Sequence, residues 1–146
     1  MIDLANSEAR HLALLHRQMI KLLDQELAPL DLGHGRYLYL FSLYLRGDRR
    51  QQELADLVGA DKAAAARALA RLEAAGYVVR RPDVKDGRAV RVDLTPRGRA
   101  LRPRLEQAAE NSIQSFTAGL TDTEHSELRR LLAKMAAPLL SAREEP

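Results

Sequence analysis

Apolar residues at intervals of three and four predict helices over most of this chain. Between residues 4 and 27, Leu12, Leu15, Met19 and Leu22 recur at that spacing, and further leucines widen the stripe beyond one face. A helix that is apolar over so much of its surface is buried on several sides. We therefore expect a second subunit to cover part of this helix.

Two short helices joined by a glycine are predicted in the middle of the chain. The apolar run of residues 36–45 lacks alternation and is interpreted as a helix after the break around Pro29. Residues 51–58 form the next helix, and Gly59 can take the left-handed conformation that ends it. Asp61 is placed to accept the free N–H groups of the following helix, residues 62–74. A short helix, a tight turn and a capped helix are the outline of a helix-turn-helix.

A switch to alternation directly behind this unit predicts a β-hairpin. Residues 77–81 and 89–94 are the two expected strands, with the charged turn 82–88 between them. Val78, Val90, Val92 and Leu94 are expected to pack on the helical core. A hairpin attached to a helix-turn-helix is a winged helix.

The helical pattern resumes after the hairpin. Thr95 is a suitable cap, Pro96 occupies the favoured first helical position, and Pro103 is placed to bend the axis. Residues 121–124 (TDTE) predict a capping box that opens a last helix with Leu128, Leu131, Leu132, Met135 and Leu139 in register. The predicted fold is mostly α with a small β-hairpin wing: a winged helix-turn-helix (31–99) flanked by helical regions (1–30 and 100–146).

Composition excludes several classes of function. The 146 residues include no Cys, so disulfides, thiolate catalysis and thiol redox switching are excluded. We find no signal peptide and no apolar run long enough to span a membrane, which favours a cytoplasmic location. The four His are scattered, and no metalloprotease, phosphate-loop or hydrolase motif occurs, so we expect no enzyme, no metal and no cofactor.

Charge is distributed unevenly along the chain. Residues 46–104 contain 15 Lys or Arg against 8 Asp or Glu, whereas the rest of the chain has more acidic than basic residues. A basic middle favours contact with a polyanion, although an ordinary solvated surface would show the same count. On the helix 62–74, Ala63, Arg67 and Arg71 share the outward face, where small residues permit a close approach and arginines reach beyond them.

The segment from Gln52 to Gly98 resembles the MarR family of winged-helix transcriptional regulators. The shared features are Asp61-Lys62 at the start of the second helix, Leu72-Glu73 before Gly76, and the wing pattern D-x-x-D-x-R-x-x-x-V-x-L-T-x-x-G. That pattern is formed here by Asp83, Asp86, Arg88, Val92, Leu94, Thr95 and Gly98. Many fixed positions at fixed spacing make the resemblance specific.

The resemblance implies a homodimer joined by its terminal helices that binds double-stranded DNA at a near-palindromic operator. It implies that the helix 62–74 enters a major groove and that Arg88, oriented by Asp86, enters the minor groove. It also implies repression, relieved in many members by a small aromatic or lipophilic molecule. The family often has Ser or Thr where this chain has Ala63 and Ala64, which leaves fewer hydrogen-bonding groups for bases.

These features give a set of candidate site residues. For DNA they are Gln51, Lys62, Ala63, Arg67, Arg71, Lys85, Asp86 and Arg88, with arginines suited to guanine and lysines to phosphates. Candidates for an effector site are His16, Arg17, Tyr37, Phe41 and Tyr44, although core or helix packing is the favoured interpretation of each. A protein-interaction module without DNA binding is the alternative function, and it would need an apolar patch on the outward face of the second helix.

Overall fold

The computed structural model describes residues 3 and 5–141, which divide into two compact units, 1–112 and 113–146. The first unit contains six helices, one 3₁₀ turn and three strands in a fixed order along the chain. They are α1 (Glu8–Leu27), η1 (Ala28–Leu30), α2 (Tyr37–Arg46), β1 (Arg49–Arg50), α3 (Gln51–Val58), α4 (Lys62–Ala74), β2 (Val78–Pro82), β3 (Val90–Leu94), α5 (Pro96–Ala100) and the first part of α6 (Arg102–Thr117).

The second unit holds the end of α6 and α7 (Asp122–Ser141). The predicted capping box opens α7: the backbone N–H of Thr121 donates to Glu124 at 2.8 Å, and that of Glu124 donates back to the Thr121 hydroxyl at 3.3 Å. No described helix combines the length and the apolar composition that crossing a bilayer needs.

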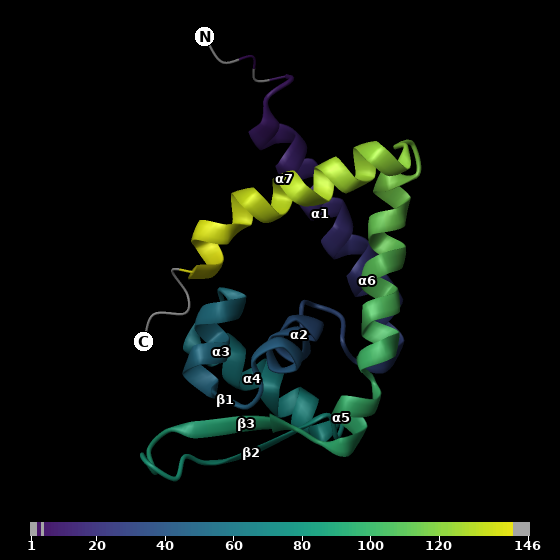
Figure 1. Ribbon diagram of the computed structural model, residues 1–146. Helices are drawn as coiled ribbons and strands as arrows, with labels where there is room; N and C mark the ends of the chain where they lie inside the picture. The colour runs from purple at the N-terminus through teal and green to yellow at the C-terminus, as the bar shows by residue number, and fades with distance from the viewer. Residues whose placement is uncertain (1–2, 4, 142–146) are drawn as a thin grey trace. The chain divides into compact units, whose positions relative to one another are not determined.

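The sheet has three antiparallel strands in the order β1-β3-β2 (Figure 1). The predicted hairpin is confirmed, with Val78 opposite Leu94 and Pro82 opposite Val90. The expectation that Val90 packs on the core is wrong, since its side chain lies 36% exposed at the turn end of the hairpin. β1 is a further strand that the sequence did not predict, because two residues are too short to show alternation.

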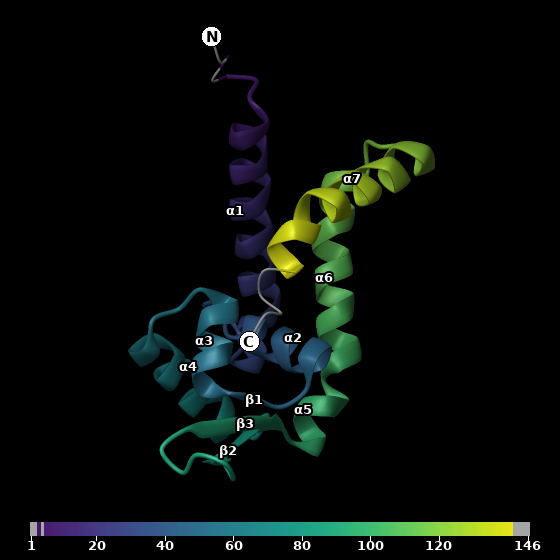
Figure 2. The same cartoon turned by 60° about the vertical axis from the view of Figure 1, so that its left-hand side comes forward.

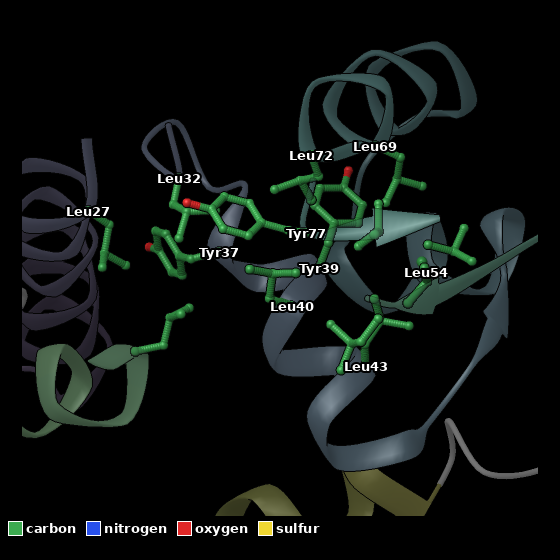
Figure 3. Packing of buried hydrophobic residues seen from close by; sticks show 14 of the residues in the cluster. Leu27, Leu32, Tyr37, Tyr39, Leu40, Leu43, Leu54, Leu69, Leu72 and Tyr77 are labelled. Carbon is green, nitrogen blue, oxygen red and sulfur yellow. The ribbon is translucent and has the colours of Figure 1, made fainter. Parts of the chain in front are cut away.

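One hydrophobic core holds the first unit together. Leu27 of α1, Leu40 of α2, Leu54 of α3 and Leu72 of α4 are fully buried, and Val92 of β3 joins them. Figure 3 shows these helices contributing side chains to one continuous cluster. Each fully buried leucine contributes about 1.5–3 kcal/mol of transfer free energy. This core fixes α3, α4 and the hairpin relative to one another.

The helix expected directly after Thr95 is interrupted at Leu101, where α5 ends and α6 begins. The interruption follows from Pro103, which has no N–H to donate to the carbonyl of Arg99, four residues earlier, and whose ring crowds that carbonyl. Leu105 and Ala108, from the predicted stripe of α6, are fully buried in the core.

The first helix begins at Glu8, later than expected, because Ser7 caps it by accepting from the Arg10 N–H at 3.3 Å. The predicted start at Leu4 lies outside the described residues. Leu23 and Leu27 are buried at the C-terminal end of α1, whereas Leu12 and Leu15 are 42% and 48% exposed. The chain itself thus covers only part of the wide apolar stripe.

Candidate nucleic-acid interface

The turn between α3 and α4 has the predicted geometry. Gly59 takes a left-handed φ of 76°, and the next N–H, that of Ala60, returns to the carbonyl of Ala55 at 2.9 Å. The Asp61 carboxylate then accepts from the Ala64 N–H at 2.7 Å, which confirms it as the cap of α4. Figure 2 shows α3 and α4 lying together beside the sheet. The helix-turn-helix predicted from the sequence is confirmed.

The two faces of α4 differ as expected. Ala65, Leu69 and Leu72 are buried, so they attach the helix to the core. Lys62, Ala63, Arg67, Arg71 and Ala74 are exposed on the other side. Among the residues that the structure describes, no large exposed apolar side chain comes from α4. The outward face is therefore cationic, with small residues between the charges.

A cleft of about 310 Å³ lies between α3, the start of α4 and the wing. Three cations line it, Arg50, Lys62 and Arg88, and no carboxylate does. Its remaining lining residues are Gln51, Gln52, Ala55, Ala65, Ala89 and Val90. The Oε1 atom of Gln51 is buried without a hydrogen-bond partner in the described part of the chain. This cleft is chemically suited to an anion, since cations surround a largely apolar floor.

The basic residues on α4 and around the hairpin differ in whether a carboxylate of the same chain pairs with them, and two groups illustrate the difference. Arg80 pairs with Glu73 at 3.0 Å, and Arg99 pairs with Asp93 at 3.2 Å. Arg81 also pairs with Asp93, at 3.4 Å. Arg80, Arg81 and Arg99 are therefore each held by a carboxylate of the same chain.

The second group has no carboxylate within ion-pair distance among residues 3 and 5–141. It comprises Lys62, Arg67, Lys85 and Arg88, all predicted to contact DNA. All four are exposed. A guanidinium or ammonium without an internal partner is free to pair with an external anion.

Arg71 differs from the other predicted DNA contacts. Its guanidinium donates to Asp31 at 3.0 Å, and the same carboxylate accepts from Arg36 at 2.9 Å. The hydrogen bond from Arg71, with the charge of Arg36, holds the pKa of Asp31 below its usual value. Arg71 is 63% exposed, yet it must share or leave Asp31 to reach an external anion.

The turn of the wing is built around Asp83. Its carboxylate accepts from the N–H groups of Lys85 at 2.8 Å and Asp86 at 3.0 Å. It also accepts from Arg50 at 3.1 Å and Arg91 at 3.3 Å. The N–H of Lys85, followed by the arginines, lowers the pKa of Asp83 strongly despite its burial. The sequence motif included Asp83, but its burial was not predicted because an Asp in a charged turn (82–88) is expected to lie in solvent.

The candidate residue Asp86 acts through the backbone. Its carboxylate accepts from the Arg88 N–H at 3.1 Å, and no ion pair joins the two side chains within the described residues. Asp86 thus fixes the chain at Arg88 and leaves the guanidinium without a carboxylate partner.

The base of the wing explains the L-T-x-x-G end of the motif. The Thr95 hydroxyl donates to the Gly76 carbonyl at 2.5 Å and accepts from the Gly98 N–H at 3.0 Å. A Cβ at Gly98 would overlap the Tyr77 carbonyl, so only glycine fits. The Tyr44 hydroxyl donates to the Gly98 carbonyl at 2.6 Å and joins α2 to this base.

The five candidate effector residues do not converge on one cavity in the described structure. Tyr37 is fully buried and meets Phe41 edge-to-face at 5.9 Å between ring centroids. Tyr44 lines a different cavity, of about 330 Å³, with Leu43, Asp93 and Arg99 among its walls. His16 and Arg17 are exposed on α1.

Comparison with known proteins identifies the family. The MarR family model matches residues 32–90. The multiple antibiotic resistance protein MarR of Salmonella typhimurium is 32% identical over 127 residues, which cover 86% of this chain and 88% of the relative. The chain belongs to the MarR family. A second relative, the uncharacterized HTH-type transcriptional regulator YybA of Bacillus subtilis, is 28% identical over 130 residues, which cover 89% of this chain and 87% of that protein.

A solved MarR structure matches most of the chain. A mutant MarR from E. coli complexed with operator DNA aligns with a TM-score of 0.71 and 30% identity, covering 87% of this chain and 91% of that one. The resemblance stated from the wing motif is thereby confirmed, as is the mostly helical fold with a small antiparallel sheet.

Proposed function

We propose that this chain is a sequence-specific regulator of transcription that binds double-stranded DNA as a homodimer. The observation that carries the proposal is the group of unpaired cations, Lys62, Arg67, Lys85 and Arg88, on α4 and the wing. Two of them, Lys62 and Arg88, face one cleft that no carboxylate lines. Membership of a family whose relative has been solved with operator DNA supports the same function.

We propose a different task for each of these side chains. α4 presents Arg67 beyond a surface of alanines, so its guanidinium suits the O6 and N7 atoms of guanine in a major groove, a pair that contributes about 1–3 kcal/mol of discrimination. Lys62 and Lys85 suit phosphates, and so does Gln51 beside Lys62 in the cleft. Arg88, on the exposed wing turn, suits a narrow minor groove. Arg71 is a weaker candidate because Asp31 already binds it.

Two exposed apolar surfaces support the dimer. On α7, Leu128, Leu131, Leu132, Met135 and Leu139 are 37–67% exposed along one side of the helix. On α1, Leu12, Leu14 and Leu15 are also exposed. Contiguous apolar surface of this kind marks an interaction site in a folded protein. A second copy of the chain would bury both surfaces. The dimer would then present two α4 helices to DNA half-sites whose centres are about 34–36 Å apart.

DNA binding is tested by selecting duplexes from a random library and measuring affinity by fluorescence anisotropy. We expect a near-palindromic consensus and an affinity that falls steeply with salt, as expected when about 6–10 phosphates are neutralised. Equal affinity for the selected and a scrambled duplex would refute sequence-specific recognition.

The dimer is tested by placing a charge on each side of α7. Leu132→Glu introduces a carboxylate into the apolar side, whereas Ala133→Glu introduces the same charge about 100° further around the helix, outside the row of leucines. We expect light scattering to show monomers for Leu132→Glu and dimers for Ala133→Glu. A variant lacking residues 121–146 is also expected to be monomeric and to bind DNA poorly. A dimer that persists in both Leu132→Glu and the truncated variant would contradict this assembly.

Relief of repression by a small aromatic or lipophilic ligand is a further part of this proposal. The resemblance to the MarR family motivates it, and the candidate residues are Tyr37, Phe41 and Tyr44 on α2 with His16 and Arg17 on α1, which line no common cavity in the described structure. Adding aromatic carboxylates to the protein–operator complex tests it, and DNA release that is lost in Phe41→Ala is the expected result. We also propose that the chain acts in the cytoplasm and has no catalytic role.

The alternative of a protein-interaction module has less support. It requires an apolar patch on the outward face of α4, where the structure places Lys62, Arg67 and Arg71 instead.

A further inference from the structure

Asp83 combines burial with charge in a way that the rest of the wing does not. Its side chain is only 2% exposed, although the neighbouring Val84 is 98% exposed. A buried carboxylate is costly unless each oxygen has donors. Both oxygens of Asp83 have them: Oδ1 accepts the N–H groups of Lys85 and Asp86, and Oδ2 accepts from Arg50 and Arg91.

These donors come from three different segments of the chain. Lys85 and Asp86 belong to the wing turn, Arg91 belongs to β3, and Arg50 lies in β1 immediately before α3. The Arg50 N–H in turn donates to Glu53 of α3 at 2.8 Å. The carboxylate of Asp83 therefore joins the tip of the hairpin to the start of α3.

The turn held in this way carries Arg88. Asp83 closes the turn with its own N–H, which donates to the Ala89 carbonyl at 2.9 Å, and the Ala89 N–H returns to the Asp86 carbonyl at 2.9 Å. Arg88 and Arg50 line the same cleft. The position of the Arg88 guanidinium relative to α3 and α4 thus depends on the contacts of Asp83.

We propose that Asp83 is a positioning residue for DNA binding, which holds the wing turn and its Arg88 against the start of α3. This inference rests on the proposed function. This role and simple electrostatics predict opposite changes in DNA affinity when Asp83 loses its charge. A carboxylate repels the DNA phosphates, so removing the charge alone would strengthen binding. A positioning role predicts weaker binding when the charge is removed.

The test compares Asp83→Asn with Asp48→Asn. Asp48 pairs with the same Arg91, at 2.7 Å, but is 52% exposed and accepts nothing from the wing turn. Both variants remove one negative charge. We expect Asp83→Asn to bind the selected duplex about tenfold more weakly, as for one lost charge-assisted hydrogen bond, and to reduce the salt slope by about one phosphate. Asp48→Asn is expected to bind as tightly as the parent chain or slightly more tightly.

Amide hydrogen exchange supplies a readout that does not involve DNA. In Asp83→Asn we expect the N–H groups of Lys85, Asp86 and Arg88 to exchange at least tenfold faster, while those of α4 keep their rates. If Asp83→Asn does not fold, Arg50→Gln loosens the same turn from the side of α3 and is expected to give the same exchange pattern.

The outcomes separate the two proposals. If the parent chain binds no duplex, the proposed function fails, and with it the positioning role. If the parent chain binds and Asp83→Asn binds equally or more tightly, only the positioning role fails. Unchanged exchange in the wing turn also overturns the positioning role.

Discussion

The role of Arg88 in DNA binding is tested by comparing Arg88→Ala with Arg81→Ala, a control variant in the same hairpin. Arg88 has no carboxylate partner among the described residues and lines the cleft beside Lys62. Arg81 lies on β2, is 60% exposed and is paired with Asp93 at 3.4 Å. Each variant removes one positive charge from the hairpin, so the long-range electrostatic effect on DNA is similar.

The expected magnitudes follow from these partners. Arg88→Ala removes a charge-assisted contact, which contributes about 1.5–3 kcal/mol, so affinity should fall about tenfold to a hundredfold. The slope of log affinity against log salt should also decrease by about 0.9. Arg81→Ala should change affinity less than threefold, because the charge of Arg81 is already offset by Asp93. In the variant, Asp93 still has its ion pair with Arg99, at 3.2 Å.

Fluorescence anisotropy at several salt concentrations, on the selected duplex and on a scrambled one, measures both quantities. Because Arg88 is assigned to the backbone and the shape of the groove, the loss should be similar on both duplexes. Equal losses for the two variants, an unchanged salt slope, or a loss confined to the selected duplex would refute the role given to Arg88.

Three further predictions concern stability. Tyr44→Phe removes the hydroxyl that donates to the Gly98 carbonyl, which keeps only the longer bond from the Leu101 N–H at 3.3 Å, and it should lower the free energy of unfolding by about 0.5–1.5 kcal/mol. Tyr37→Phe, whose hydroxyl has no partner in the described chain, should be neutral or stabilising, and equal losses in urea unfolding would contradict this. Gly98→Ala should lower the melting temperature more than Gly87→Ala, because a Cβ meets the Tyr77 carbonyl at the first site and open space at the second. Burial raises the pKa of Tyr37 to about 12 from its usual 10.0, so the unfolded chain loses this proton first and stability should decline as pH rises from 10 towards 12. Tyr37→Phe should lessen that decline, and identical alkaline profiles would show that Tyr37 does not cause it.

The elements with strong periodicity could be predicted from the sequence. α3 and α4 have the expected bounds because Gly59 and Asp61 mark the turn between them chemically. The hairpin shows alternation over β3, and its bounds differ by one residue from the prediction. These features depend on glycines, capping residues and alternation within a few neighbouring positions, all of which can be seen in the sequence.

The contacts between distant residues could not be predicted in the same way. The pair between Arg71 and Asp31 joins residues 40 positions apart, and β1 exists only because β3 provides its partner strand. The burial of Asp83 depends on Arg50, 33 positions earlier in the chain. Composition alone would place all of these charged residues in solvent.

The candidate DNA residues were selected by charge, spacing and family resemblance. The structure refines that choice, because the presence or absence of an internal carboxylate separates Arg88 from Arg81 and Arg67 from Arg71. This distinction depends on contacts in the folded chain, because all four arginines carry the same charge and look alike in the sequence.

Sedimentation velocity of the purified chain with a labelled operator duplex at low salt tests the central proposal most directly, because it reports assembly and DNA binding together. We expect one species that contains two protein chains and one duplex, and a free protein that sediments as a dimer. A free protein that sediments as a monomer and leaves the duplex unshifted would contradict the account.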